Sequence, residues 1–252
     1  MKLYGLIGFP LAHSFSKNYF TKKFEEGGIA DCLFENFELA SIDEVGAMLQ
    51  QNPLLLQGFA ITIPYKKKIL PFLSSTTGEV KKMEACNCVK VIDGKLFGFN
   101  TDTIGFEQSL KKYLQPHHTK ALILGSGGAA NAVEFVLNKL NIGFLTVSRN
   151  KSRESNVIAY EDLDKAIIST HTLIINATPL GTYPKVEEFP PIPYQFITSQ
   201  HYLFDLVYNP AKTKFLEKGE EQGAAIQNGY DMLTIQAEEN WKIWNEDLPS
   251  EI

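Results

Sequence analysis

The stretch ALILGSGGAANAVEF, residues 121–135, contains the pattern on which the fold assignment rests. Four apolar residues predict a buried strand, and the apolar spacing after the glycine-rich turn predicts a helix. The turn fits G-x-G-x-x-A, in which the glycines permit a tight turn and close approach of the backbone to a pyrophosphate. Similar turns also serve packing alone, but this context favours a dinucleotide site made of Gly125, Ser126, Gly127, Gly128 and Ala129.

The end of the next predicted strand distinguishes between the two nicotinamide dinucleotides. An NAD site usually has Asp or Glu there, which holds the ribose 2′-hydroxyl. In this chain the strand ends at Ser148, Arg149 follows, and Arg153 is close behind. A guanidinium binds a 2′-phosphate through two parallel hydrogen bonds, whereas a carboxylate would repel it. The alternative is a solvated turn, but the residues favour NADP as the cofactor.

Short apolar runs alternate with amphipathic stretches along most of the chain, which is the pattern of βα units in an α/β protein. Asp93-Gly94 between two apolar runs is a strong signal for a β-hairpin. The buried strands of the second half indicate a parallel, doubly wound, Rossmann-like sheet. Strands are expected at 3–9, 33–39, 55–63, 87–92, 95–100, 121–124, 144–148, 173–176, 202–207 and 224–227, and helices at 16–26, 41–50, 103–114, 131–140 and 230–244.

This alternation predicts two α/β domains. Residues 115–118, Gln-Pro-His-His, interrupt the periodicity and separate the two sets of strands. We expect residues 1–102 together with 230–252 to form one domain, to which the C-terminal helix returns, and residues 103–229 to form the other. Only about 20 residues separate Arg153 from the strand at Leu173, so one crossover helix should be shortened or lost.

Composition excludes several classes of protein. The 252 residues include 44% apolar and 21% charged side chains, which argues against disorder, and the formal charge of −5 argues against nucleic acid or an anionic membrane as a partner. No apolar run approaches the length of a membrane span. Three cysteines without a second Cys/His pair argue against a disulfide framework or a metal site. We expect a cytoplasmic protein, monomeric or homodimeric, that binds a small molecule.

The N-terminal half offers candidates for a substrate site. Ser14 and Ser16 lie two residues apart before a predicted helix, so both hydroxyls can face one carboxylate, although simple N-capping explains such a pair as well. Pro64 predicts a helix start that would place Lys66 in the first turn, where the helix dipole favours proton release. Asp102 follows the hairpin and is placed to pair with Lys66, but a lone Asp there is also a common helix cap.

Taken together, these segments resemble the shikimate dehydrogenase family along almost the whole chain. The matches occur in the order of the family: His-Ser-x-Ser at 13–16, Thr-Ile-Pro-Tyr-Lys at 62–66, Asn87, Asn-Thr-Asp at 100–102, Gly-Ser-Gly-Gly-Ala at 125–129, Ser-Arg-Asn at 148–150, Asn-Ala-Thr-Pro at 176–179, Asp-Leu-Val-Tyr at 205–208, and Asn228-Gly229 through Gln236.

The resemblance implies an oxidoreductase of aromatic amino-acid biosynthesis that interconverts 3-dehydroshikimate and shikimate with NADP. The first domain would bind the substrate, and Lys66 with Asp102 would form the catalytic acid–base pair. The substrate contacts implied are Ser14 and Ser16 for the carboxylate, Thr62, Asn87, Asp102 and Gln236 for the ring hydroxyls, and Tyr208 from the nucleotide side. The cofactor contacts implied, besides the glycine turn, are Ser148, Arg149, Arg153, Asn176, Thr178, Leu206 and Gly229.

Two positions depart from the family pattern. Ala60 stands where Asn is common, and Asp231 stands where the residue is usually small or neutral. Two other functions remain open: a relative that prefers quinate or uses NAD, and a non-catalytic NADP-binding regulator on the same fold. A regulator would be marked by loss of Lys66 or Asp102, and both are present.

Overall fold

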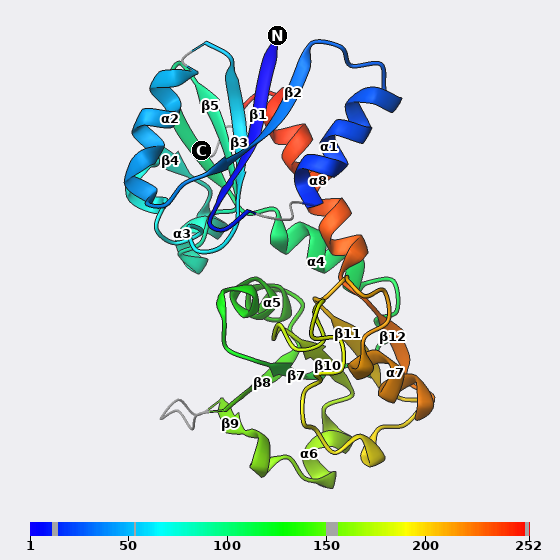
Figure 1. Cartoon of the computed structure of the whole chain (residues 1–252). Helices are drawn as coiled ribbons and strands as arrows, with labels where there is room; N and C mark the ends of the chain where they lie inside the picture. Colours follow the sequence, from blue (N-terminus) through cyan, green and yellow to red (C-terminus); the bar gives the residue numbers. More distant parts are fainter. Residues whose placement is uncertain (12–14, 53, 150–155, 250–251) are drawn as a thin grey trace. The chain divides into compact units, whose positions relative to one another are not determined.

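The structure is a computed structural model that describes residues 1–11, 15–52, 54–149, 156–249 and 252. Ser14 and Arg153 therefore lie outside the described residues. The chain divides into two compact units, residues 1–101 with 236–252 and residues 102–235. Each unit has its own six-stranded sheet (Figure 1). The expected α/β class, with a Rossmann-like second unit, is confirmed.

The first unit is a mixed sheet with helices on both faces. Its strand order is β2-β1-β3-β5-β6-β4, in which β1, β2 and β3 are parallel and β5 is antiparallel to both of its neighbours. The elements are β1 (Lys2–Gly8), α1 (Phe15–Glu26), β2 (Cys32–Glu38), η1 (Ile42–Glu44), α2 (Val45–Gln51), β3 (Leu56–Ile61), η2 (Leu70–Phe72), β4 (Ser75–Thr76), α3 (Gly78–Met83), β5 (Cys88–Ile92), β6 (Lys95–Phe99) and the end of α8 (Tyr230–Asn245).

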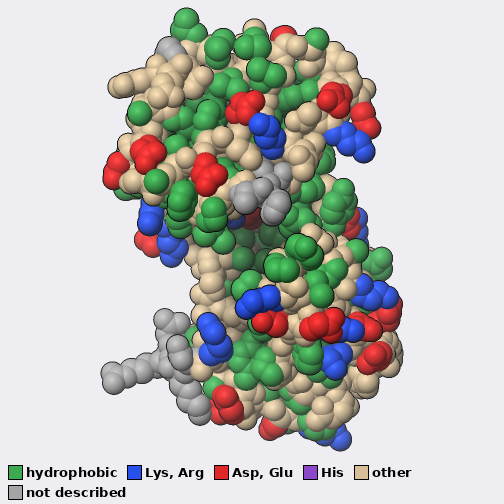
Figure 2. Space-filling view, in the orientation of Figure 1, with side chains coloured by type: hydrophobic (Ala, Val, Ile, Leu, Met, Phe, Trp, Pro, Cys, Tyr) green, Lys and Arg blue, Asp and Glu red, His purple; other side chains and the backbone are tan. Residues whose placement is uncertain are grey.

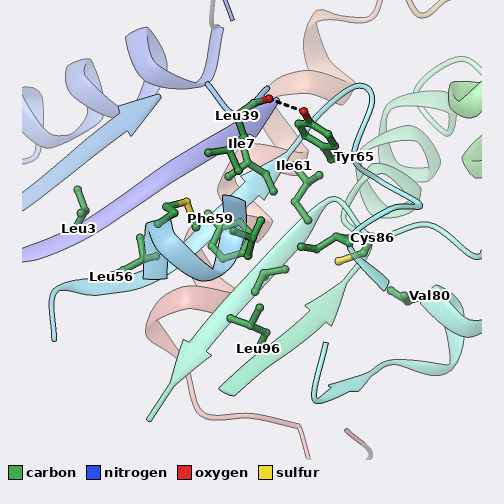
Figure 3. Close-up of a cluster of buried hydrophobic side chains, with 14 residues drawn as sticks. Leu3, Ile7, Leu39, Leu56, Phe59, Ile61, Tyr65, Val80, Cys86 and Leu96 are labelled. Atoms are coloured by element: carbon green, nitrogen blue, oxygen red, sulfur yellow. Dashed lines mark hydrogen bonds between the residues drawn. The ribbon is translucent and has the colours of Figure 1, made fainter. Parts of the chain in front are cut away.

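Alternation along the strands builds a core on each face of this sheet. On β1, Leu3 and Ile7 pack with residues of α2 and α3, whereas Tyr4 and Leu6 pack with α1 and α8. Figure 3 shows the first of these cores, in which the buried Tyr65 donates its hydroxyl hydrogen to the carbonyl of Leu39. These cores fix the carboxyl ends of the strands, where the candidate substrate residues follow.

The predicted hairpin is confirmed. β5 and β6 pair with Ile92 opposite Lys95. Asp93 and Gly94 between them both have positive φ, 48° and 74°, as a two-residue type I′ turn requires. The hairpin carries the chain to Asn100-Thr101-Asp102 at its end.

The second unit has the dinucleotide-binding topology. All its strand pairs are parallel, and the sheet order β9-β8-β7-β10-β11-β12 is the doubly wound order 3-2-1-4-5-6. α4 and α5 pack on one face, and α6 and α7 on the other. The elements are α4 (Asp102–Leu110), β7 (Lys120–Leu124), α5 (Gly128–Lys139), β8 (Gly143–Ser148), β9 (Val157–Ala159), η3 (Tyr160–Asp162), α6 (Lys165–Thr170), β10 (Leu173–Asn176), η4 (Tyr194–Phe196), β11 (Tyr202–Asp205), α7 (Lys214–Glu221) and β12 (Ala225–Gln227).

The shortened crossover is also confirmed. The helix before β10, α6, has only six residues, and the short strand β9 takes part of the length that a full helix would use. The expected helix 103–114 is shorter too, because α4 ends at Leu110 and turns follow.

The helix expected from Pro64 is wrong. Residues 63–64 and 66–69 form turns, and only the short 3₁₀ helix η2 follows. The carbonyl of Lys66, which a helix would bond to Leu70, instead accepts a hydrogen bond of 2.8 Å from the amide of Cys86, and Leu70 bonds to Lys67. Burial of Tyr65 in the core holds this segment against the sheet. The dipole argument for Lys66 therefore does not apply.

Candidate active site

The glycine turn has the conformation that its sequence predicts. Gly125 has φ of +101°, and a Cβ there would lie 2.8 Å from the Thr178 side chain, so only glycine fits. Gly127 precedes α5 at its N-cap and Gly128 is its first residue. A Cβ on either would meet no atom within 4 Å, so the backbone borders open space at the start of a twelve-residue helix. Such a site suits a phosphate group.

A pocket of about 470 Å³ opens beside this turn. Ser148, the last residue of β8, and Arg149, which follows it, line the pocket together with Thr178, two residues after β10. Its described lining contains an arginine and no carboxylate, which fits the phosphorylated ribose of NADP better than that of NAD. The lining residues are Gly125, Ser126, Gly127, Val147, Ser148, Arg149, Tyr160, Thr178, Pro179, Leu180 and Pro191.

Five of these residues were missed by sequence reasoning: Val147, Tyr160, Pro179, Leu180 and Pro191. Tyr160 belongs to η3 and lies close enough to Arg149 for the guanidinium to oppose the rise that burial causes in the pKa of its phenol. Pro179 stands in the quoted Asn-Ala-Thr-Pro motif, but Tyr160 and Pro191 belong to no motif and reach the pocket only through the fold.

Asn176 is fully buried and supports Thr178, a residue of the pocket lining. Its Oδ1 accepts hydrogen bonds from the amide and hydroxyl of Thr178, at 3.0 and 2.6 Å. Its Nδ2 donates to Asp205 Oδ1 at 2.9 Å. These contacts give Asn176 a positioning role for Thr178, and its direct contact with a cofactor stays a prediction.

Asp205 is a fully buried carboxylate at the end of β11. It accepts hydrogen bonds from Asn176, from the amide of Val207 at 3.0 Å and from the hydroxyl of Thr213 at 2.5 Å. Burial raises its pKa to about 6, although the three hydrogen bonds favour the charged form. Asp205 thus connects the wall of the pocket to the segment that begins at Leu206.

The structure brings Leu206 and Gly229 together, as a shared role requires. A Cβ on Gly229 would lie 2.2 Å from the carbonyl oxygen of Leu206, so the two backbones touch only because this position is glycine. The amide of Gly229 donates to the carbonyl of Val207 at 3.1 Å. Tyr208 follows, is 38% exposed, and has its pKa raised by partial burial. Their contacts with nicotinamide or substrate stay predictions.

In the first unit, a series of buried hydrogen bonds joins Asn87 to Gln236, which are both predicted substrate residues. Asn87 and Thr101 bond through both side chains and the amide of Thr101. The Thr101 hydroxyl bonds Asn240 Oδ1 at 2.7 Å, and Asn240 Nδ2 bonds Gln236 Oε1 at 3.2 Å. Asn87 and Gln236 are therefore ends of one network. No sequence pattern pointed to Asn240, which lies inside an amphipathic helix.

The loop after β3 is tied to the same region through its backbone. The amide of Cys86 bonds the carbonyl of Lys66, and the amide of Ile61 bonds the carbonyl of Asn87, each at 2.8 Å. Thr62 packs close to Gly8, where a Cβ would lie 2.5 Å from its methyl group. Lys66 is half-buried, whereas Lys67 and Lys68 are exposed. The local fold therefore separates Lys66 from the two lysines that follow.

The serine pair is described only in part. Ser14 lies outside the described residues. Ser16 is half-buried and is the second residue of α1, which begins at Phe15. The helix was expected to begin at Ser16 but begins at Phe15, so Ser16 lies inside the helix and is not its N-cap. Ser16 still stands in the first turn, among amides that have no partner within the helix.

The two departures from the family pattern have clear local roles. Ala60 is buried on β3 among apolar side chains that pack against α1 and α8. Asp231, at the start of α8, pairs with Lys112 at 2.8 Å and accepts a hydrogen bond from Gln227 at 3.0 Å. Asp231 thus holds the start of α8 to the end of the α4 segment.

Surface charge and metal chemistry add little to the site. Figure 2 shows Lys, Arg, Asp and Glu side chains interspersed over the visible face. The described residues also include exposed ion pairs such as Lys17–Glu35. Among the described residues, no three His, Cys, Asp or Glu side chains are grouped to hold a metal ion. No helix in the described part of the chain is both long and apolar enough to span a membrane.

Comparison with known proteins identifies the family. Residues 6–89 match the family model described as the shikimate dehydrogenase substrate binding domain. The shikimate dehydrogenase (NADP(+)) of Methanosphaera stadtmanae is 32% identical over 262 residues, which cover 98% of this chain and 92% of the relative.

Solved structures agree over the full length. A chorismate mutase/shikimate 5-dehydrogenase fusion protein from Clostridium acetobutylicum has a TM-score of 0.85 at 34% identity, covering 100% of this chain and 93% of that one. The shikimate 5-dehydrogenase of Thermus thermophilus, in complex with NADP(H) and shikimate, has a TM-score of 0.85 at 28% identity, covering 100% and 96%. This chain belongs to the shikimate dehydrogenase family.

Proposed function

We propose that this chain catalyses the reversible NADPH-dependent reduction of 3-dehydroshikimate to shikimate. The observation that carries the proposal is the pocket at the glycine turn, which has Arg149 and no carboxylate in its described lining. Its position in a chain similar over 98% of its length to an NADP-dependent shikimate dehydrogenase supports the same cofactor here. Binding of NADP would use the turn 125–129, Ser148, Arg149 and Arg153.

We assign substrate binding to the first domain, residues 1–102 with 230–252, and NADP binding to residues 103–229. The match of residues 6–89 to the substrate-binding family supports the first assignment. The strand order 3-2-1-4-5-6 supports the second. Substrate contacts would come from Ser14, Ser16, Thr62, Asn87, Gln236 and Tyr208, and nicotinamide contacts from Leu206 and Gly229.

Lys66 and Asp102 are inferred to carry the proton. NADPH, when bound at the glycine turn, would supply a hydride for the ketone carbon, and the π electrons of the C=O bond would pass to its oxygen. The ammonium of Lys66 then gives its proton to the ketone oxygen, and the resulting amine regains one from solvent. Asp102 would hold the ammonium in place by charge, and in the reverse direction Lys66 accepts the hydroxyl proton.

Backbone hydrogen bonds near Lys66 and Asp102 support this pairing. The carbonyl of Lys66 is bonded to the residue before Asn87, and Asn87 Oδ1 bonds the amide of Thr101, which directly precedes Asp102. Asn87 is thus a common neighbour of both chain segments. The contact between the two side chains remains part of the proposal.

Mixing the protein with shikimate and NADP tests the reaction directly. We expect NADPH to form, seen by its absorbance, and to disappear when 3-dehydroshikimate is added. Initial rates with quinate and with NAD measure the two nearest alternatives. A protein that binds NADP but forms no NADPH with shikimate or quinate would be a regulator, and the proposal would fail.

The cellular setting is part of the same proposal. All three cysteines are buried and none forms a disulfide within the described part of the chain, which fits a reducing cytoplasm. We infer a monomer or homodimer whose partners are small molecules rather than nucleic acid.

A further inference from the structure

A buried line of four polar side chains crosses the first unit between Asn87 and Gln236. The exposed fractions are 2% for Asn87, 1% for Thr101, 1% for Asn240 and 8% for Gln236. Buried amides and hydroxyls cost free energy unless they are hydrogen-bonded, and here each one bonds the next. Asn240 stands between Ala237 and Trp244, which are both buried among apolar side chains. An apolar residue at 240 would suit that packing, so the amide needs another explanation.

A backbone group fixes the direction of the first hydrogen bonds in this line, and a difference in distance decides the next one. The amide of Thr101 can only donate, and it donates to Asn87 Oδ1 at 2.7 Å. Nδ2 of Asn87 must then be the atom that donates to the Thr101 hydroxyl, at 3.0 Å. That hydroxyl has a single hydrogen. It lies 2.7 Å from Asn240 Oδ1 and 3.2 Å from Asn87 Oδ1, so we take it to donate to Asn240.

The same logic continues to the end of the line. Because Oδ1 of Asn240 accepts from Thr101, its Nδ2 faces Gln236 and donates to Oε1 at 3.2 Å. Oε1 of Gln236 is thus turned toward Asn240, and its Nε2 points to the opposite side of the amide. Gln236 is therefore oriented as a hydrogen-bond donor on the side away from Asn240.

We propose that Asn240 is a positioning residue, which orients the Gln236 amide so that its Nε2 donates a hydrogen bond to an oxygen of the substrate. The inference rests on the proposed function and adds to it a residue that no family motif marks. It also fixes the polarity of recognition: the substrate oxygen met by Gln236 acts as an acceptor.

The variant Asn240→Asp tests the inference. A carboxylate keeps the acceptor for the Thr101 hydroxyl and nearly the same size, but places oxygen where Nδ2 donated. Gln236 must then turn its amide over and present Oε1 to the substrate. We expect the KM for shikimate to rise about tenfold, the kcat to change less than about threefold, and the KM for NADP to stay the same.

Asn245→Asp provides a matched control on the same helix. Asn245 is exposed, its Oδ1 accepts from Tyr4, and a carboxylate retains that contact. We expect wild-type kinetics from this control. The pair Thr101→Val and Thr101→Ser offers a second route: loss of the hydroxyl should raise the KM for shikimate, and serine should restore it, with thermal melting used to verify folding.

A double-mutant cycle separates positioning from simple support of the fold. If Asn240 acts through Gln236, the variant Gln236→Ala combined with Asn240→Asp should have the same KM for shikimate as Gln236→Ala alone. Multiplying effects would overturn the inference, as would an unchanged KM in a folded Asn240→Asp variant. Absence of turnover by the wild-type protein would instead overturn the proposed function, and this inference with it.

Discussion

Arg149 is the residue that we propose to distinguish NADP from NAD. It is exposed at the end of β8 and lines the pocket beside the glycine turn. A guanidinium bonded to a 2′-phosphate gains charge-assisted hydrogen bonds that the 2′-hydroxyl of NAD cannot offer in equal strength. Specificity for NADP should therefore depend on this one charge more than on the shape of the turn.

We expect Arg149→Ala to raise the KM for NADP by about 10- to 100-fold and to change the KM for NAD much less, because a hydrogen bond to a charged group contributes about 1.5–3 kcal/mol. Initial rates with both cofactors measure this ratio. Lys212→Ala, which removes an exposed cation paired with Glu220, is the control. Equal losses for both cofactors would contradict a role at the 2′-phosphate.

Lys66 differs from its neighbours in exposure, and this difference makes its role testable. We expect Lys66→Ala to lower kcat by about 10²- to 10⁴-fold, the usual contribution of a general acid, with little change in substrate affinity. Binding of shikimate measured by titration separates the two effects. Lys67→Ala, at an exposed position, should keep normal turnover. A Lys66→Ala enzyme with normal turnover would remove Lys66 from the mechanism.

At the scale of elements, the buried carboxylate of Asp205 holds the end of β11, and its burial disfavours the charged form. Asp205 has its pKa raised from 3.8 to about 6, so the folded state binds its proton more tightly than the unfolded state. The stability that this proton contributes is fully present below pH 4 and is lost as pH rises through about 6. The three hydrogen bonds to Asp205 keep the charged form tolerable at neutral pH.

We expect Asp205→Asn to remove this dependence. The free energy of unfolding of the wild type, relative to that of the variant, should fall by about 2.4 kcal/mol between pH 4 and pH 7. Urea unfolding at several pH values gives this difference. The buried His118 and His171, whose pKa values are lowered, contribute equally to both proteins, so their contributions cancel. Asp164→Asn, at an exposed N-cap, is the control. Parallel curves for wild type and Asp205→Asn would contradict the argument.

How far sequence predicts an element depends on where its hydrogen bonds go. The glycine turn was predicted from its glycines, although the amide of Gly125 bonds the distant carbonyl of Val147. The Asp93-Gly94 hairpin satisfies its backbone groups between strands that are adjacent in sequence, so a short pattern predicted it. The segment after Pro64 does not, because Cys86, twenty residues away, takes the carbonyl of Lys66. Asn240 and Tyr160 were missed for the same reason: each reaches a candidate site only through tertiary contacts that no local pattern encodes.

At the scale of the whole molecule, each described hydrophobic core belongs to one unit. Two core clusters lie within residues 1–101 and 236–252, and two lie within 102–235. The glycine turn and its pocket belong entirely to the second unit, and the Asn87–Gln236 network entirely to the first. Each proposed ligand should therefore stabilise mainly the unit whose residues contact it.

Calorimetry of the intact protein with single ligands tests this division. NADP at 100 times its dissociation constant should raise the free energy of unfolding by about 2.7 kcal/mol, because it binds the folded state alone. If the units melt separately, NADP should shift only one transition, and Arg149→Ala should abolish that shift at the same concentration. Shikimate should shift the other transition, and Asn240→Asp should weaken its effect. A shift of both transitions by NADP alone would contradict the independence of the two units. Stabilisation would then pass between units that share none of the described core clusters.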